Sequence, residues 1–230
     1  MDHLLVQGHA ATPLTKGLCS LASAEQAREL ALVIAREQAR LAVGLPMTEA
    51  AGTESELGIL ARLAVHIEHN RLDRSVQPIY QGREQLMVGA AALLGEDASL
   101  ECQDALRLLA LLLDKLLRGG RGSQQAKLDG LSVTAMEGRA LAAQSPNTGA
   151  VVRGSWRRKA RNQLGHASWL DVVEAALWCF WHSDDLRGGE ALLGVQLGAD
   201  GRVRLVYGML AGPFYLADTA TISANPSSSI

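Results

Sequence analysis

The sequence lacks several features by which common classes of protein are identified. No apolar run reaches the roughly 18–20 residues that a membrane-spanning helix needs. Residues 1–5 contain no basic segment ahead of an apolar one, so no secretory signal is visible. The three cysteines, Cys19, Cys102 and Cys179, form no Cys-x-x-Cys pair and indicate neither a zinc cluster nor a disulfide framework. We therefore expect a cytoplasmic protein that does not bind to a membrane.

The chain also lacks a strong charge of either sign. Its 22 Lys and Arg residues nearly balance 24 Asp and Glu residues, giving a formal net charge of −2. A nucleic-acid-binding domain normally carries a basic surface, so this balance argues against a nucleic-acid partner. The 230 residues, 48% of them hydrophobic, suffice for one large domain or two small ones. We expect a single domain over residues 1–220 and a disordered tail over 221–230. The alternative is two lobes that divide near residue 120 or 147.

Phe, Tyr and Ile are scarce whereas Leu and Ala dominate, which favours helices over strands. Ser23 with Gln26, and Ser168 with Asp171, have the spacing of capping boxes at helix starts. Apolar residues at helical spacing predict helices over residues 23–42, 53–70, 84–94, 99–118, 124–143, 168–182 and 186–197. Residues 71–82 are expected to form a loop, 145–149 a turn and 151–165 an irregular segment. The predicted fold class is all-α, although residues 199–207, with Asp-Gly followed by alternation, also fit a hairpin strand.

One dense basic cluster is present in the sequence. It consists of Arg153, Arg157, Arg158, Lys159 and Arg161. Guanidinium groups suit the recognition of phosphates and carboxylates, so the cluster is a candidate surface for an acidic partner or a pyrophosphate. A solvated loop is the simpler interpretation of the same residues.

Aromatic and histidine residues also have two interpretations each. His66 and His69 share one helix face and suggest a metal site, but their spacing differs from His-Glu-x-x-His, so solvated histidines are the simpler interpretation. Four aromatic residues gather in one predicted helix and either pack in the core or stack on a nucleotide base. They are Trp169, Trp178, Phe180 and Trp181.

The adjacent carboxylates Asp184 and Asp185 suit either a divalent cation or the N-cap of the helix that follows, and we favour the cap. The glycine-rich residues 119–122 lack the Lys-Ser/Thr of a P-loop and are interpreted as a flexible turn. No Gly-x-Ser-x-Gly motif of a serine hydrolase is present in the sequence.

The C-terminal third contains the most specific motifs. They are WLDVVEAALW at residues 169–178, HSDD at 182–185, EALLGVQLG at 190–198 and YGMLAGPFY at 207–215, with AREQARL at 35–41 and Pro46 as weaker support. Together these segments resemble the ADP-ribosylglycohydrolase family over most of residues 20–216. The resemblance implies an all-α bundle in which residues 203–215 are helical.

The chain departs from this family at the metal-binding motifs. Family members use two Mg²⁺ ions, held by carboxylates and hydroxyls, to cleave the glycosidic bond of ADP-ribose. Their N-terminal Thr-Asp-Asp segment has no counterpart here, so the chain resembles a member that is incomplete at its N-terminus. Their second motif, Gly-Asp-Ala-Asp-Thr-Thr, corresponds to GADGRV at 198–203, where Asp200 is the one carboxylate and Arg202 and Arg204 add positive charge. Because Mg²⁺ needs several oxygen ligands, we expect that no metal is bound.

The resemblance and the departures together suggest a degenerate homologue that binds rather than hydrolyses. Its partner would be ADP-ribose, an ADP-ribosylated protein or an ADP-ribosyltransferase. The candidate ligand-binding residues are Gly198, Asp200, Arg202 and Arg204, of which the two arginines would replace the lost cations. An active ADP-ribosyl hydrolase with a rearranged site around Asp200 is one alternative. The other is an interaction-only remnant that forms a homo-oligomer, because a missing lobe would expose apolar surface.

Overall fold

The computed structural model describes residues 12–47, 55–73, 79–95, 97–198 and 200–216. Every regular element in these residues is helical, which confirms the all-α fold class. The tail expected over 221–230 lies outside the described residues. Within these ranges, no helix combines the length and the apolar character that crossing a membrane requires.

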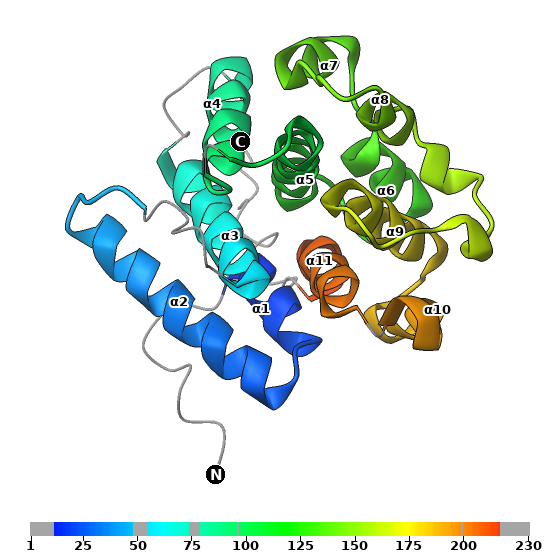
Figure 1. Ribbon diagram of the computed structural model, residues 1–230, viewed down its shortest axis with the longest axis horizontal. Helices are drawn as coiled ribbons and strands as arrows, with labels where there is room; N and C mark the ends of the chain where they lie inside the picture. The colour runs from blue at the N-terminus through cyan, green and yellow to red at the C-terminus, as the bar shows by residue number, and fades with distance from the viewer. Residues whose placement is uncertain (1–11, 48–54, 74–78, 96, 199, 217–230) are drawn as a thin grey trace, which may run out of the picture.

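Eleven α-helices make up the described part of the chain (Figure 1). They are α1 (Pro13–Ser20), α2 (Ala24–Ala42), α3 (Glu56–Asp73), α4 (Ile79–Ala92), α5 (Leu100–Arg118), α6 (Gln124–Leu131), α7 (Ala135–Leu141), α8 (Pro146–Val152), α9 (Trp169–His182), α10 (Leu186–Gly198) and α11 (Gly201–Ala211). Two 3₁₀ turns, Ser155–Arg157 and Arg161–Gln163, lie between α8 and α9, and a π-helical turn, Gly212–Leu216, follows α11.

The core is organised around α5, α9 and α11. In Figure 1, α5 lies near the centre, with α3 and α4 on one side and α6, α8 and α9 on the other. Helix α5 buries twelve of its nineteen residues, as expected of a helix that is covered on nearly all sides. Helix α11 packs between α1 and α9, and the buried apolar side chains from Leu14 to Phe214 form one cluster.

Local capping signals place several helix starts correctly. The Ser23 N–H donates to Gln26 Oε1 at 2.9 Å, and the Gln26 N–H donates to Ser23 Oγ at 3.2 Å. Ser168 and Asp171 form the same reciprocal pair at the start of α9, with distances of 3.1 and 3.2 Å. These hydrogen bonds confirm the predicted starts of α2 and α9. The sequence could predict both starts because a capping box uses only groups that lie three residues apart.

Three local predictions are wrong. The loop expected over 71–82 is wrong at both ends, because α3 continues to Asp73 and α4 begins at Ile79, and residues 74–78 lie outside the described residues. The expected turn over 145–149 is instead the start of α8, where Pro146 takes the first helical position that its fixed φ favours. The single helix expected over 124–143 is two helices, because Thr134 caps a new helix at Ala135.

The hairpin interpretation of residues 199–207 is also wrong. Asp200 is the N-cap of α11, and its side chain accepts a hydrogen bond from the Arg202 N–H at 2.9 Å. Asp is common both in turns and at N-caps, so the residue type alone does not separate the two structures. The helix over 203–215 that the resemblance implies is present as α11 and the π-helical turn after it.

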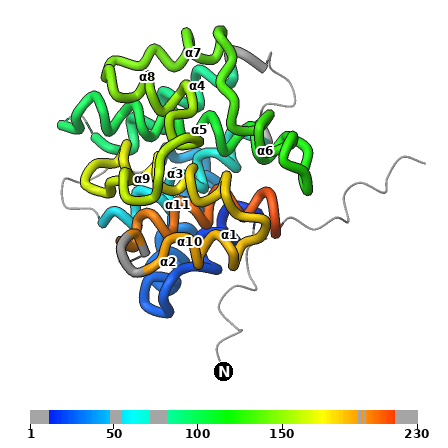
Figure 2. The backbone as a smooth tube through the Cα atoms, turned by 90° about the vertical axis from the view of Figure 1, so that its right-hand side faces the viewer, coloured from blue at the N-terminus to red at the C-terminus, as the bar shows by residue number. Residues whose placement is uncertain are grey.

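Helices α1 and α11 touch through their backbones, and they lie side by side in both views (Figures 1 and 2). A Cβ atom on Gly17 would come within 2.1 Å of the Gly208 carbonyl oxygen, and one on Gly208 within 2.5 Å of the Gly17 oxygen. A Cβ on Gly212 would lie 2.4 Å from the oxygen of Pro13. Glycine is therefore required at these positions by close approach of two backbones.

Two cationic side chains are buried in the core, which the sequence analysis did not foresee. Lys127 Nζ donates to the carbonyl oxygens of Phe180, at 3.0 Å, and Ser183 at the end of α9. The rings of Phe180, Phe214 and Tyr215 lie 5.2–5.7 Å from the same nitrogen. Burial lowers the pKa of Lys127. Arg62 similarly donates to the Leu93 carbonyl at 3.2 Å, so both cations satisfy backbone groups at helix ends.

Replacing Gly208 with Ala is expected to lower the free energy of unfolding by about 1–3 kcal/mol, because the added methyl group must separate the two backbones. The matched control is Gly138→Ala on α7, where a Cβ would meet no heavy atom within 4 Å. The control is expected to leave stability unchanged or to raise it by up to about 1 kcal/mol through helix propensity. Urea denaturation followed by circular dichroism measures both. Equal effects of the two substitutions would contradict a tight contact.

Candidate functional site

Asp200 and Arg202 form a bidentate ion pair at the N-terminus of α11. Arg202 Nε lies 3.0 Å from Asp200 Oδ1, and Arg202 Nη2 lies 2.7 Å from Asp200 Oδ2. The Arg202 backbone N–H also donates to Asp200 Oδ1, so the same carboxylate caps the helix and holds the guanidinium. Forked contacts of this kind combine strong hydrogen bonds with a fixed orientation. The arginine is therefore positioned by its own helix cap.

Two distant segments complete the cluster around Arg202. Glu56 Oε1, in the first turn of α3, accepts from Arg202 Nη1 at 3.0 Å. The carbonyl oxygen of His166 accepts from Arg202 Nη2 at 2.8 Å, and His166 Nδ1 lies 3.2 Å from Asp200 Oδ2. The guanidinium carbon lies 6.0 Å from the centroid of the Trp169 ring. Arg202 thus ties α11 to the start of α3 and to the loop before α9.

The charges of this cluster reinforce one another. Burial alone would raise the pKa of Asp200, but the hydrogen bonds and charge of Arg202 outweigh it and hold that pKa below its usual value. The hydrogen bond to Asp200 in turn raises the pKa of Arg202. Both groups are therefore ionised at neutral pH, where two carboxylates, Asp200 and Glu56, face one guanidinium.

A pocket of about 190 Å³ opens beside this cluster. Its walls combine the polar side chains of the cluster with apolar residues of α3 and α11: Gln26, Glu56, Leu57, Leu60, Asp200, Gly201, Arg202 and Leu205. Sites for drug-sized ligands usually enclose about 300–1,000 Å³. The pocket therefore has room for one group of a larger ligand, such as a phosphate or a ribose.

The other two candidate ligand-binding residues contribute less to the described geometry. Arg204 is half-buried on α11, two residues beyond Arg202. Gly198 is the last residue of α10, and its surroundings lie outside the described structure. Their role in binding stays a prediction.

The basic residues over 153–161 diverge in the structure. Lys159 Nζ pairs with the buried carboxylate of Glu174 at 2.5 Å, and Arg161 Nη2 donates to the Leu193 carbonyl at 2.7 Å. Arg157 lies over the rings of Trp156 and Trp181, 4.7 and 5.4 Å from their centroids. Three of the predicted cations thus have intramolecular partners.

The remaining two, Arg153 and Arg158, are exposed, and the partner surface stays a prediction for them. Beside Lys159 lies a pocket of about 430 Å³ that includes Ser155, Asp171 and Glu174. Ser155 Oγ and Lys159 Nζ both donate to Glu174, and the Ser168 N–H donates to Asp171. These carboxylates therefore fix the segment before α9 onto that helix.

The aromatic cluster packs in the core, as the simpler interpretation predicts. Trp169, Trp178 and Phe180 are buried, and Trp181 packs edge-on against Trp156 with ring centroids 5.7 Å apart. The preferred interpretation of the adjacent carboxylates is also confirmed, because Asp185 Oδ1 accepts from the Gly188 N–H at 2.6 Å at the start of α10.

The two histidines on α3 do not converge. Both ring nitrogens of His66 face neighbours: Nε2 lies 3.0 Å from the Leu86 carbonyl oxygen and Nδ1 lies 3.1 Å from Asn70 Nδ2. His69 is exposed. Across the described residues, no three His, Cys, Asp or Glu side chains gather as they would to hold a metal ion. The expectation that the chain binds no metal stays a prediction.

Glu56 and His166 are the cluster residues that the sequence analysis missed. Glu56 lies in the first turn of a predicted helix, where an acidic residue is readily explained by helix capping. It is also 146 positions from Arg202, so no local pattern links the two residues. His166 contributes its backbone carbonyl to Arg202, a group that every residue carries. Charge complementarity between Glu56 and Arg202 is the one signal that sequence offers, and many other pairs share it.

Asp200→Asn is expected to lower the free energy of unfolding at pH 7 by about 1–3 kcal/mol, because the charge-assisted pair with Arg202 is lost. The pKa of Asp200 is lowered in the folded protein, so its stabilisation is complete above the ordinary Asp pKa of about 3.9 and is lost as the pH falls through the lowered pKa. The difference between the two proteins should be constant from about pH 5 to 7 and shrink below about pH 4. Denaturation at several pH values measures it. Asp129→Asn, at an exposed position, is the control, and an equal loss there would contradict this role.

Comparisons of this chain with family models, with curated proteins and with solved structures give no significant match. The cluster of Glu56, His166, Asp200 and Arg202 must therefore be interpreted from its own geometry. The likeness to the ADP-ribosylglycohydrolase motifs remains a resemblance of short segments.

Proposed function

We propose that the chain is a non-hydrolytic ADP-ribosylglycohydrolase-like protein that binds an ADP-ribosyl group, either as free ADP-ribose or on a modified protein. The proposed contact is between the pyrophosphate and Arg202 at the N-terminus of α11. The observation that carries this proposal is the way Arg202 is held: rigidly by Asp200 within its own helix, and only at the surface by Glu56.

The side chain of Arg202 is preorganised for binding an anion, because its hydrogen bonds to Asp200 already fix its orientation. Its side chain is 21% exposed, and Asp200 engages Nε and Nη2 from one side. A side chain that is ordered before binding loses less conformational entropy when the ligand arrives. The N-terminus of α11 adds the favourable end of a helix dipole for a negative group.

Glu56 is the group that an incoming phosphate oxygen would replace. Its side chain is 52% exposed, and it touches Arg202 through one hydrogen bond to Nη1. Exposed ion pairs contribute only about 0–1 kcal/mol, so exchange of this partner costs little. The more buried Asp200 would stay in place, and the pocket of about 190 Å³ would admit one phosphate while the rest of the ligand lies on the surface.

The same contacts support binding rather than hydrolysis. Metal-assisted hydrolysis uses carboxylates that are available to coordinate a cation and orient water. The two carboxylates nearest the start of α11, Asp200 and Glu56, both hold the guanidinium of Arg202. A divalent cation could coordinate these two carboxylates only if it displaced the guanidinium of Arg202, which cannot diffuse away because it belongs to the chain.

The test is calorimetric titration with ADP-ribose, first with Mg²⁺ and then with EDTA. Wild-type binding should be unaffected by EDTA. Arg202→Ala should weaken it at least about tenfold, equivalent to about 1.4 kcal/mol. Glu56→Ala should leave affinity unchanged or raise it up to about fivefold, because a competing carboxylate is removed. Arg187→Ala, which removes an exposed arginine paired with Glu190, is the matched control and should change nothing.

Three results would overturn the proposal. Absence of ADP-ribose binding, or equal affinity of wild type and Arg202→Ala, would remove the assigned site and favour a role in protein interaction alone. Binding that requires Mg²⁺, together with release of ADP-ribose from a modified arginine, would show that the chain is a hydrolase.

A further inference from the structure

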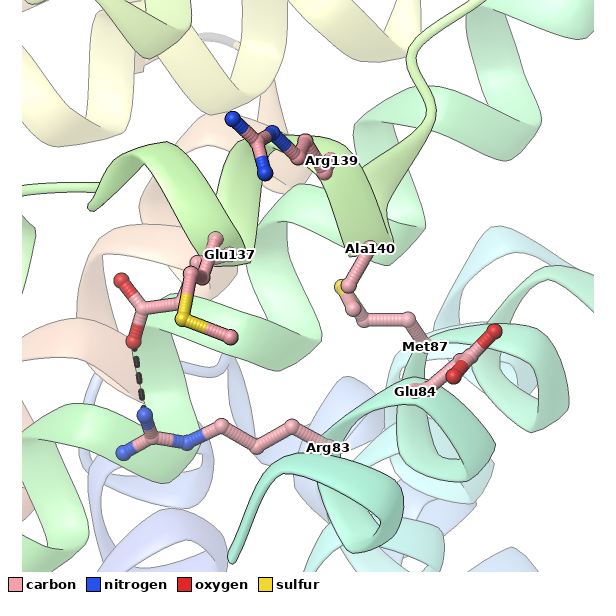
Figure 3. A pocket seen from close by; sticks show the side chains of 7 residues that line it. Arg83, Glu84, Met87, Glu137, Arg139 and Ala140 are labelled. Carbon is pink, nitrogen blue, oxygen red and sulfur yellow. Dashed lines mark hydrogen bonds and ion pairs between the residues drawn. The ribbon is translucent and has the colours of Figure 1, made fainter.

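A third pocket, separate from the α11 site and from the pocket beside Lys159, lies between α4 and α7. It encloses about 330 Å³. Arg83 and Met87 extend from α4 toward α7, and Glu137 extends from α7 to meet Arg83, while Ala140 lies opposite Met87 (Figure 3). Glu84 and Arg139, which also line the pocket, point away from the Arg83–Glu137 pair (Figure 3). The interior therefore combines apolar walls with one ion pair.

Arg83 has donors that its intramolecular contacts leave unused. Its side chain is 17% exposed, Nε donates to Asp114 Oδ2 at 3.2 Å, and Nη1 donates to Glu137 Oε1 at 2.7 Å. Within the described residues, Nη2 makes no hydrogen bond. A guanidinium group carries five N–H donors in a planar fork that matches a carboxylate.

The electrostatic surroundings of Arg83 favour an anion. Its two carboxylate partners, Asp114 and Glu137, are buried and already have other cations. Arg118 Nε lies 2.9 Å from Asp114 Oδ1, and Lys115 Nζ lies 3.0 Å from Glu137 Oε2. Three cationic side chains thus face two carboxylates in this described cluster. The other two charged residues that line the pocket, Glu84 and Arg139, are one of each sign, so the cluster and the lining together carry one positive charge in excess.

The apolar part of the pocket is adaptable. Met87, from α4, is 1% exposed and forms part of the lining, whereas Met136, from α7, is 56% exposed. Unbranched thioether side chains adjust to ligands of different shape, and an exposed methionine over a pocket can cover a bound apolar group. Ala140 adds a small, half-buried surface to the same lining.

We propose that this pocket binds a small amphipathic monocarboxylate, with its apolar body against Met87, Met136 and Ala140 and its carboxylate accepting a hydrogen bond from Arg83 Nη2. The volume of about 330 Å³ is at the lower end of ligand sites, which suits a molecule built on one aromatic ring or a short alkyl chain. This inference does not depend on the proposed binding of ADP-ribose.

The probe is 3-phenylpropionate, which we would titrate calorimetrically into the full chain. Its uncharged amide and the corresponding amine, 3-phenylpropylamine, serve as matched ligands. The carboxylate should bind at least about tenfold more tightly than either, because only the carboxylate pairs with a guanidinium. Equal binding of the three ligands, or no binding of the carboxylate, would overturn the proposal.

The position of the site is tested with Ala140→Phe, which fills the pocket and removes no ion pair. Ala39→Phe, at an exposed position on α2, is the control. Circular dichroism and thermal melting establish that both variants are folded. Binding of 3-phenylpropionate should fall at least about tenfold in the first variant and be unchanged in the second. Unchanged affinity in folded Ala140→Phe would show that the ligand binds elsewhere.

Arg83→Lys provides an independent measurement, because it keeps the positive charge but loses the planar fork. The affinity for the carboxylate should fall toward that for the amide. If Arg83→Lys is too unstable to study, the comparison of Ala140→Phe with Ala39→Phe decides the question by itself.

Discussion

The direct backbone contact between α1 and α11 determines where the candidate site lies. Gly17 and Gly208 bring the two helices closer than any Cβ atom would permit, and Gly212 extends the contact into the π-helical turn. Helix α11 is held between α1 and α9, so its N-terminus is fixed beside the first turn of α3. Interiors are close-packed, so a shift of α11 by the width of a methyl group would be transmitted to Asp200 and Arg202. The glycines do not line the pocket, yet the contact that they permit positions its polar groups.

At the end of that helix, one carboxylate performs two structural tasks. Asp200 caps α11 and holds the guanidinium of Arg202, which in turn reaches Glu56 and the His166 carbonyl. The guanidinium of an arginine held by a local helix cap is already oriented before a ligand binds. It therefore loses less conformational entropy on binding than a flexible surface arginine does. The pocket between α4 and α7 follows a similar principle, with Arg83 held by two buried carboxylates. Both sites therefore derive from arginines whose orientation the fold determines.

The sequence predicts those parts of the fold that depend on nearby residues. The starts of α2 and α9 follow from caps such as Ser23 and Ser168, whose partners lie three positions away. The sequence does not distinguish structures that use the same residue types, so Pro146 suggests a turn where it begins a helix, and Asp200 fits a hairpin where it caps α11. The contact of Glu56 with Arg202 spans 146 positions and depends on the packing of α3 against α11. A pattern of neighbouring residues in the sequence cannot predict a contact between residues so far apart.

The central claim is that Arg202 keeps Asp200 as its partner while it exchanges Glu56 for a phosphate oxygen. Nuclear magnetic resonance of the arginine Nε–H signals tests it directly during titration with inorganic pyrophosphate. The Arg202 Nε–H donates to Asp200 Oδ1, so its signal should remain sharp and protected while it shifts in a saturable way. A shift confined to the signals of exposed arginines such as Arg153 and Arg158, with the Arg202 signal unchanged, would contradict the account.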